Sequence, residues 1–386
     1  MAVTVKALLK NGTFLYKMSL IAGKAGLSNS VHWVHIIEDE SVSPFLHGGE
    51  LVFTAGILNK QDDWLLDFSR KLYLAGASAF VVNVGPHTKE IPASVVAYCD
   101  EVGLPLFTIP WETKMVDMTR DFCHRIIQAE QRENTIMTTM KNILFKVGDV
   151  NTQVLQMERF GYQRDSTYCF ACIQADDEGR MDADELQAAL KASLEHAAKN
   201  ISGLTTTFTY KDCRVVALCG LSEPEIREFL EEFSAHCARR LGAARLHIGV
   251  SPNQAGLYHQ TANFEKALSA MDMAVKRREI ISWYDQLGIH KVLYAVQDKA
   301  VLRSFFGDTV GKLEQYDREN STALAALLKD YLEMNGVLQT VADKHFMHRN
   351  TVTNQLKRIE SVTGYNPLDL NGKVLLAMGF YIKDVL

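Results

Sequence analysis

The residues best suited to chemistry in this sequence lie in a short window near its C-terminus. Between Lys344 and Ile359 the chain carries four Lys or Arg side chains, two His and no acid, although its formal net charge is −5. Arginine, asparagine and threonine can read base edges in the major groove, whereas lysine and arginine can hold phosphates. The window therefore indicates contact with a polyanion, which is the chemistry of recognition and not of catalysis.

The apolar residues in this window and just before it have the spacing of a helix-turn-helix, in which a short helix and a second helix are locked together across a tight turn. The residues expected to form this lock are Val341, Ala342, Met347, Val352 and Leu356. The turn lacks its usual glycine, and Phe346 or Met347 stands there instead. The alternative is a solvated helical hairpin whose basic face is incidental.

The remaining polar residues of the window are free to face outward. We expect Arg349 to pair with guanine and Asn350 with adenine, while Lys344 and Arg358 hold phosphates. The predicted DNA-binding residues are Lys344, His348, Arg349, Asn350, Thr351, Thr353, Asn354, Lys357 and Arg358.

Helices must position this window, because the last third of the chain has a helical apolar period. The stretch "STALAALLKDYLEMNG" predicts a helix with Ser321 as its N-cap and Gly336 as its C-terminal stop. A final helix is expected from about residue 372 to 383.

Residues 165 to 285 read as strand, helix, two paired strands, helix, strand, helix and strand. This is the split ferredoxin-like order, and it predicts an antiparallel sheet with helices on one face. The expected helices run over about 183–200, 224–241 and 254–277. Many nucleotide cyclases share this plan, but a fold alone does not carry a function.

Two observations argue against catalysis in that region. The turn between the paired strands is "TYKDCRV", in which Asp212 is the only acid and no glycine is present. Metal-assisted phosphoryl chemistry needs paired carboxylates, so we expect no cyclase activity and predict that the chain is not an enzyme. Cys169 and Cys172 form a Cys-x-x-Cys in a predicted strand, where they point to opposite faces, so core packing is favoured over metal or redox use. No catalytic residue, cofactor or metal is expected.

The first 110 residues alternate short apolar runs with glycine turns and a helical stretch, which predicts an α/β domain. Glu50, Thr54 and Asn83 are polar residues in or at the ends of two predicted strands. One interpretation is that they line a ligand pocket at the strand ends, the usual position in open α/β sheets. The other is that nearby backbone satisfies them.

A long connecting helix is expected from Glu112 to about Val147, because this stretch contains no proline or glycine. Met115, Phe122, Ala129, Ile136 and Ile143 recur every seven residues, yet the companion positions are poorer, so a strict coiled-coil seam fails. Whether the helix pairs with a second chain is left open.

Composition limits the number of domains and the cellular compartment that the sequence suggests. The 386 residues are 47% hydrophobic and 23% charged, which is ordinary for a well-cored chain of two to four domains. No run of 18 apolar residues occurs, and the seven cysteines show no framework spacing. We therefore expect a cytoplasmic protein.

The longer stretch "HFMHRNTVTNQLKRIESVTGYNPLDLN" resembles the C-terminal helix-turn-helix of the PucR (purine catabolism regulator) family of bacterial transcription factors. The family's His-Arg-Asn-Thr followed by an apolar residue stands here at 348–352, and its later glycine is Gly364. Thr353 and Asn354 replace the usual aromatic or basic residues, which affects the expected operator sequence. The N-terminal stretches "AGKAGLSNSVHWVHIIED", "LHGGELVFTAG" and "GLPLFTIPWE" are similar to the family's sensor domain, and residues 165–285 to its degenerate cyclase-like domain.

The resemblance implies a multidomain regulator that combines α/β, α+β and all-α parts. Its expected divisions are a ligand-sensing domain over 1–111, a linker helix over 112–150, a degenerate GGDEF-like domain over 160–288 and a helix-turn-helix domain over 310–386. The expected partners are double-stranded promoter DNA, a small-molecule effector, such as one from purine or other nitrogen-compound catabolism, and a second copy in a homodimer or higher oligomer. The alternative is a metabolite-binding protein or enzyme with a vestigial DNA-binding domain.

Overall fold

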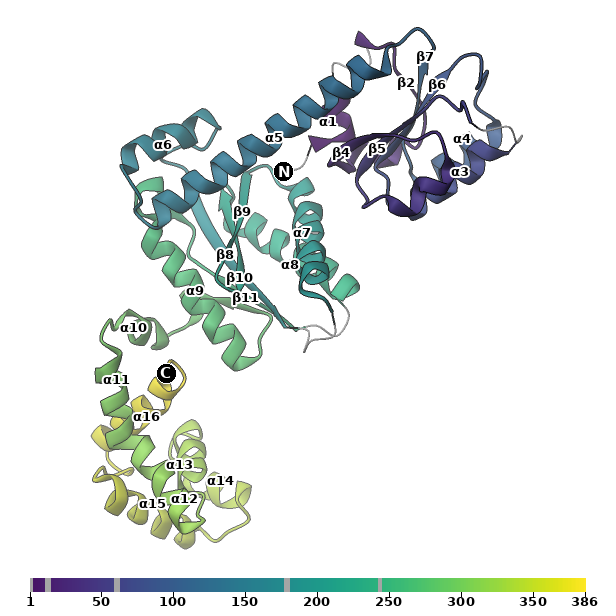
Figure 1. Ribbon diagram of the computed structural model, residues 1–386. Coiled ribbons are helices and arrows are strands. Elements are labelled where there is room, and N and C mark those ends of the chain that lie inside the picture. The colour runs from purple at the N-terminus through teal and green to yellow at the C-terminus, as the bar shows by residue number, and fades with distance from the viewer. Residues whose placement is uncertain (1–2, 11–14, 59–62, 177–180, 242–244) are drawn as a thin grey trace. The chain divides into compact units, whose positions relative to one another are not determined.

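The computed structural model describes residues 3–10, 15–58, 63–176, 181–241 and 245–386 (Figure 1). The chain divides into two compact units, Met1–Thr138 and Thr139–Leu386. Among the described residues, no helix combines the length and the apolar character that crossing a membrane requires.

The first unit is built on a five-stranded sheet in the order β2-β7-β6-β5-β4. Its strands are β2 (Ser19–Ala22), β4 (Trp33–Ile36), β5 (Glu50–Thr54), β6 (Ala79–Val84) and β7 (Leu106–Pro110). The strands from β4 to β7 are parallel, and β2 runs antiparallel to β7. The short strands β1 (Val3–Thr4) and β3 (Ser30–Val31) pair separately. The predicted α/β class of this region is confirmed.

Helices cover both faces of this sheet. Helices α3 (Trp64–Leu74) and α4 (Ala93–Val102) share one apolar cluster with Val52 of β5. The next residue, Phe53, packs on the other face with α1 (Val5–Leu9) and the first half of the long helix α5. This alternation is what a parallel sheet buried on both faces requires. The structure adds α4 to the helix predicted from the sequence.

Helix α5 runs over Met115–Leu144 and contributes to both cores. Phe122 and Ile126 are buried in the first unit, whereas Ile143 and Leu144 are buried in the second. The helix stops at Leu144, and a separate helix, α6 (Val150–Arg159), follows. Two residues of the seven-residue repeat, Phe122 and Ile143, are thus used inside the chain, and pairing with a second chain remains a prediction.

The second unit begins with a sheet in the order β13-β11-β8-β10-β9, with β12 (Gln254–Ala255) also paired to β8. Its strands are β8 (Thr167–Asp176), β9 (Leu204–Tyr210), β10 (Cys213–Cys219), β11 (Arg245–Val250) and β13 (Ile281–Trp283). The predicted element order is confirmed. The sheet is mixed and not antiparallel throughout, because β13 runs parallel to β11.

The prediction that the helices share one face of this sheet is wrong. Helices α7 (Ala183–Ala197) and α8 (Glu223–Leu241) cover one face, and α9 (Gln260–Arg277) covers the other (Figure 1). Gly249 of β11 permits this, since a Cβ there would lie 1.9 Å from the backbone nitrogen of Met271 in α9. Helix α9 also starts later than expected, because Gln254 and Ala255 pair with β8 and a 3-10 turn over Leu257–His259 precedes the helix.

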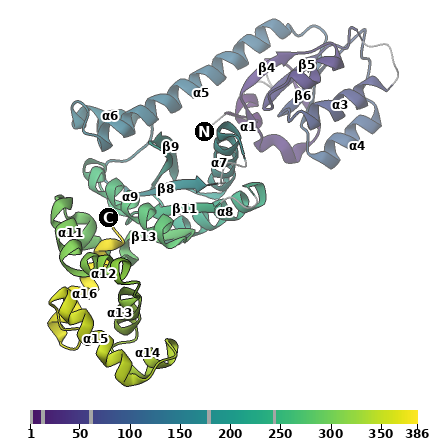
Figure 2. The same ribbon diagram turned by 60° about the horizontal axis from the view of Figure 1, so that its bottom comes forward.

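Helices α10 to α16 complete the second unit (Figure 2). Their bounds are α10 (His290–Ala295), α11 (Lys299–Phe306), α12 (Lys312–Asn320), α13 (Leu324–Glu333), α14 (Leu338–Lys344), α15 (Arg349–Thr363) and α16 (Leu370–Lys383), with a π-helical turn over Gly307–Gly311 between α11 and α12.

The start of α13 differs from the prediction. Ser321 does not cap this helix; it ends α12 with a φ of +53°. The cap is supplied by Asp317 of α12, whose carboxylate accepts the N–H groups of Leu324 and Ala325 at 2.8 Å each. A carboxylate at a helix N-terminus satisfies otherwise unpaired donors and suits the helix dipole.

Candidate nucleic-acid interface

The predicted lock between α14 and α15 is confirmed. Val341, Ala342, Val352 and Leu356 are each fully buried in a single apolar cluster that also holds residues of α12, α13 and α16. Met347 is partly buried against the same cluster. The two helices are therefore fixed to each other and to the rest of the C-terminal helices.

The turn of the motif forces Phe346 into an unusual conformation. Its φ is +51°, in the left-handed region that favours glycine, and the side chain is 97% exposed. A residue with a Cβ loses about 1–2 kcal/mol there, and this phenyl ring recovers little of it by burial. Of the two residues considered for the glycine position, the structure selects Phe346.

Replacing Phe346 with glycine is expected to leave the domain as stable as before, or more stable by up to about 1.5 kcal/mol. The relief of the left-handed strain outweighs the roughly 0.5–1 kcal/mol that glycine adds to the entropy cost of folding. Urea unfolding of the parent, Phe346→Gly and Phe346→Ala would measure this. Alanine keeps the strain, so a glycine variant less stable than the alanine variant would contradict the explanation.

The first turns of α15 present the expected recognition residues to solvent. Arg349, Asn350, Thr351 and Asn354 are exposed, and Thr353 is half-buried. Exposed residues of this kind at the start of the second helix are what a helix-turn-helix places in the major groove.

His348 also has a structural role that sequence reasoning missed. It is the N-cap of α15, and its Nδ1 accepts the backbone N–H of Asn350 at 3.2 Å. The acceptor role requires the proton on Nε2, which remains the donor available to a ligand. A His directly before a helix of polar residues is the signal that could have indicated this cap.

Of the four basic residues of the window, two have a partner within the described part of the domain and two do not. Arg358 donates from Nε to the Tyr316 hydroxyl at 2.8 Å, and Lys344 pairs with Asp330 at 2.6 Å. Arg349 and Lys357 are exposed and make no ion pair with any residue that the structure describes. The latter two are thus the cations most available to a polyanion.

Asp330 joins α13 to the end of α14. Its carboxylate contacts Lys344 and, at 2.8 Å, His345 Nε2, and its side chain is only 16% exposed. Burial acts to raise the pKa of Asp330, but the hydrogen bonds and charges of Lys344 and His345 outweigh it, so the pKa lies below its ordinary 3.8.

Asp330→Asn should therefore destabilise the domain by about 1–2 kcal/mol at neutral pH. Because the carboxyl pKa is lowered on folding, its contribution is present above pH 3.8 and is lost as the pH falls through the folded value. The stability difference between parent and variant, measured by urea unfolding, should shrink below about pH 4. A difference that stays constant from pH 7 to pH 3 would disprove the linkage.

The structure does not bring the three expected ligand residues together. Glu50 and Thr54 stand at opposite ends of β5, and Glu50 accepts the His47 N–H at 2.8 Å. Thr54 lies at the carboxyl end of β5, two residues after Val52, and so shares the face of the sheet that α3 and α4 cover. Asn83 lies two residues after Val81 and so shares the other face, which α5 covers.

The carboxyl edge of the five-stranded sheet of the first unit nevertheless gathers polar groups. Glu38, which sequence reasoning missed, accepts the N–H groups of Ala55 at 2.8 Å and Ile57 at 3.0 Å, and the Thr54 hydroxyl donates to it at 3.4 Å. Asn83 Oδ1 and Thr88 Oγ1 are buried and have no hydrogen-bond partner among the described residues. An acid just after a parallel strand is the signal that could have found Glu38.

The sheet of the second unit joins β9 and β10 by a hairpin that turns on Lys211 and Asp212. No group of three metal-ligating side chains is found among the described residues. Cys169 faces α7 and α8, whereas Cys172 faces away from them. Burial raises the pKa of Cys169 to about 12, so the thiol stays protonated at neutral pH.

Comparison with known families accounts for most of the chain. Residues 7–126 match the model of the purine catabolism regulatory protein-like family. Residues 151–273 match a GGDEF-like domain, and residues 324–382 match the PucR C-terminal helix-turn-helix domain. This chain belongs to the PucR family. The order of the three matches along the chain is the order of the first sheet, the second sheet and the C-terminal helices of this PucR-family protein.

Curated relatives of this PucR-family protein occur in Bacillus subtilis (strain 168). They include the DNA-binding transcriptional activator AdeR (22% identical over 40% of this chain), the proline-responsive transcriptional activator PutR (24% over 39%) and the purine catabolism regulatory protein (24% over 34%). The matched regions cover 39%, 37% and 28% of those proteins. A regulator of polyketide synthase expression from Bifidobacterium adolescentis matches 65% of this chain and 98% of its own at 17% identity and a TM-score of 0.32.

Proposed function

We propose that this PucR-family protein is a cytoplasmic transcription regulator that binds promoter DNA through α14 and α15. The observation that carries the proposal is the exposed first turn of α15, where Arg349 and Asn350 stand beside each other on a fully packed helix-turn-helix. Two relatives are named as transcriptional activators, which supports regulation over catalysis and makes activation the first direction to test.

A gel-shift titration with the promoter beside the protein's own gene tests this proposal. Sequence-specific retardation should weaken steeply as salt rises, because binding to phosphates releases counterions. Equal affinity for promoter and scrambled DNA at low salt, with and without candidate metabolites, would refute it. That outcome would favour a metabolite-binding protein or enzyme with a vestigial DNA-binding domain.

We further propose that a small-molecule effector binds at the carboxyl edge of the five-stranded sheet of the first unit, with Asn83 as a contact. A buried amide oxygen without a partner is costly, and a ligand donor would satisfy it. An effector can change DNA binding only if it has different affinities for two arrangements of the protein.

A thermal-shift screen with purines, ureides, amino acids and amines addresses the effector. A compound that binds only the folded state raises the melting temperature. The rise should be lost in Asn83→Ala and kept in Glu50→Gln, because Glu50 lies at the opposite end of the sheet. A compound that stabilises parent and Asn83→Ala equally would place its site elsewhere.

A further inference from the structure

Helix α16 carries an apolar stripe that its own domain does not cover. Leu370 is 79% exposed, Val374 51% and Tyr381 41%, and Ala377 lies between the last two. The spacings of four, three and four residues place all of them on one side of the helix. The opposite side, with Leu376 and Ile382, is buried.

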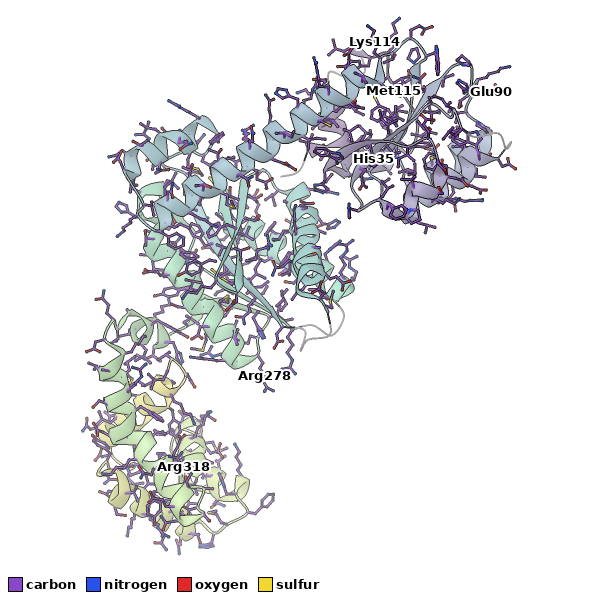
Figure 3. The ribbon with its side chains drawn as sticks, viewed as in Figure 1. His35, Glu90, Lys114, Met115, Arg278 and Arg318 are labelled. Carbon is purple, nitrogen blue, oxygen red and sulfur yellow. The ribbon has the colours of Figure 1, made fainter. Side chains whose placement is uncertain are left out.

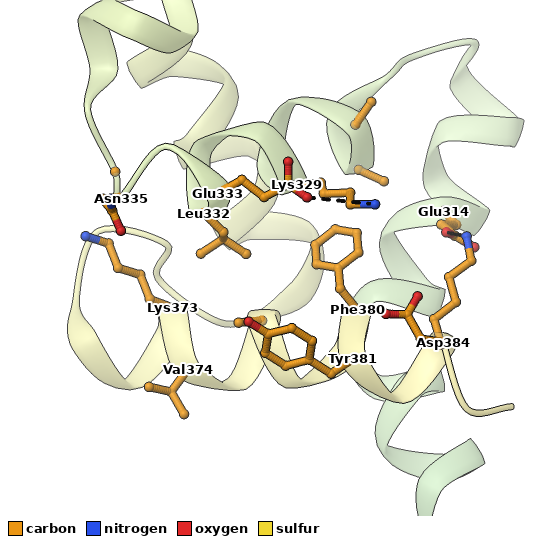
Figure 4. A pocket seen from close by; sticks show the side chains of 15 residues that line it. Glu314, Lys329, Leu332, Glu333, Asn335, Lys373, Val374, Phe380, Tyr381 and Asp384 are labelled. Carbon is orange, nitrogen blue, oxygen red and sulfur yellow. Dashed lines mark hydrogen bonds and ion pairs between the residues drawn. The ribbon is translucent and has the colours of Figure 1, made fainter. Parts of the chain in front are cut away.

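A groove of about 730 Å³ runs beside this stripe, between α13 and α16 (Figure 4). Ala325 and Ala326 of α13 and Ala377 of α16 line it with small side chains, which leaves room for side chains from another helix. Its charged residues are Glu314, Lys329, Glu333, Lys373, Lys383 and Asp384. Three are basic and three acidic, so the surface has no net preference for an anion or a cation.

Two of these charges lie at the ends of α16 where the helix dipole disfavours them. Lys373 is in the first turn, where the helix dipole disfavours a cation, and Asp384 follows the last turn, where the dipole disfavours an anion. Lys373 stacks 5.5 Å from the centre of the Tyr331 ring and makes no ion pair with any described residue. Asp384 lies 3.2 Å from His290 Nε2 and is half exposed. Figure 4 shows Lys373 and Asp384 at opposite ends of the groove.

We propose that this surface binds a second copy of the same chain, with the two α16 helices antiparallel about a two-fold axis at the level of Met378 and Gly379. In that arrangement Lys373 of each copy lies beside Asp384 of the other copy. Each helix end then receives the charge that its dipole favours, and Val374 and Tyr381 enter the grooves lined by alanine. A two-fold interface must be self-complementary, and a stripe with opposite charges at its two ends meets that condition.

The balanced charge is the reason to choose a second copy over other occupants. A nucleic acid or another anionic ligand would meet the acids of the rim, and a cationic partner would meet its lysines. The inference deepens the proposed function, since a dimer supplies two recognition helices for two half-sites, but its test needs no DNA.

The test is a charge reversal in the full-length chain, read by analytical ultracentrifugation. The parent should sediment as a dimer at micromolar concentration. Lys373→Asp and Asp384→Lys should each raise the dimer dissociation constant at least about 10-fold, because the two-fold axis creates the like-charge contact twice. The double variant should recover the parent's dissociation constant. Arg318→Asp, an exposed change on α12 labelled in Figure 3, should leave it unchanged.

The outcomes separate this inference from DNA binding. A monomeric parent, or single variants that dimerise like the parent, would overturn the α16 interface whatever the gel shift shows. Loss of dimer in both singles without recovery in the double would also overturn it, because misfolding would then be the common cause. Recovery in the double supports it even if no promoter binding is found.

Discussion

Asn350→Ala is expected to lose about 1–3 kcal/mol of specific promoter binding, a loss of roughly 5- to 150-fold in affinity, with no loss of stability. The Asn350 side chain is exposed in the first turn of α15, and only its backbone N–H takes part in the His348 cap. Arg349→Ala should show a loss of similar size, because a bidentate arginine contact to guanine is worth about as much.

Competition gel shifts with promoter and scrambled DNA would measure both losses. Lys357→Ala is the matched control on the same exposed face, since removing a phosphate-binding charge there should weaken binding to both DNAs alike and lower the salt dependence. If Arg349→Ala binds the promoter as tightly as the parent does, the assignment of α15 as the recognition helix is wrong.

Leu356→Ala is expected to destabilise the C-terminal helices by about 2–5 kcal/mol. Leu356 is fully buried in the cluster that joins α15 to α13 and α14, and its truncation leaves a cavity that the surrounding helices fill only in part. Promoter binding should fall for every sequence at temperatures where the domain is partly unfolded.

Urea unfolding followed by circular dichroism would measure this effect. Lys357→Ala changes the adjacent exposed position and should stay within about 0.5 kcal/mol of the parent. Two variants one residue apart thus separate the residues that fold the motif from those proposed to contact DNA. Equal stability of Leu356→Ala and Lys357→Ala would contradict the packing described for α15.

The sequence predicted the helix-turn-helix well because its determinants are local. Val352 and Leu356 are one turn apart on α15, and Ala342 lies on α14 just before the tight turn, so local spacing specified which side chains meet. The α13 cap was missed because it is tertiary: Asp317 reaches from the preceding helix to a start that Ser321 was expected to cap. The local sequence pattern does not show whether a helix is capped by the residue just before it or by a side chain of a neighbouring helix.

Two other predictions differ from the structure, and the physical reason for the first could be read from the sequence. Glu50 and Thr54 are four residues apart in one strand, which separates them by about 13 Å, so they could not have lined the same strand ends. The position of α9 on the second face of the sheet of the second unit was harder to predict from the sequence. It depends on Gly249 allowing α9 to approach the strand, and a lone glycine in an apolar strand does not say which helix comes close.

Helix α5 imposes a constraint on chain length. Its two ends are anchored by Phe122 in one core and Ile143 in the other, while most side chains from Ile127 to Asn134 between them are exposed. One residue inserted in that stretch would turn Ile143 by about 100° about the helix axis relative to Phe122, whereas seven would turn it by nearly two full turns. Substitutions in the exposed middle of α5 change neither this spacing nor either core, so that stretch should tolerate them freely.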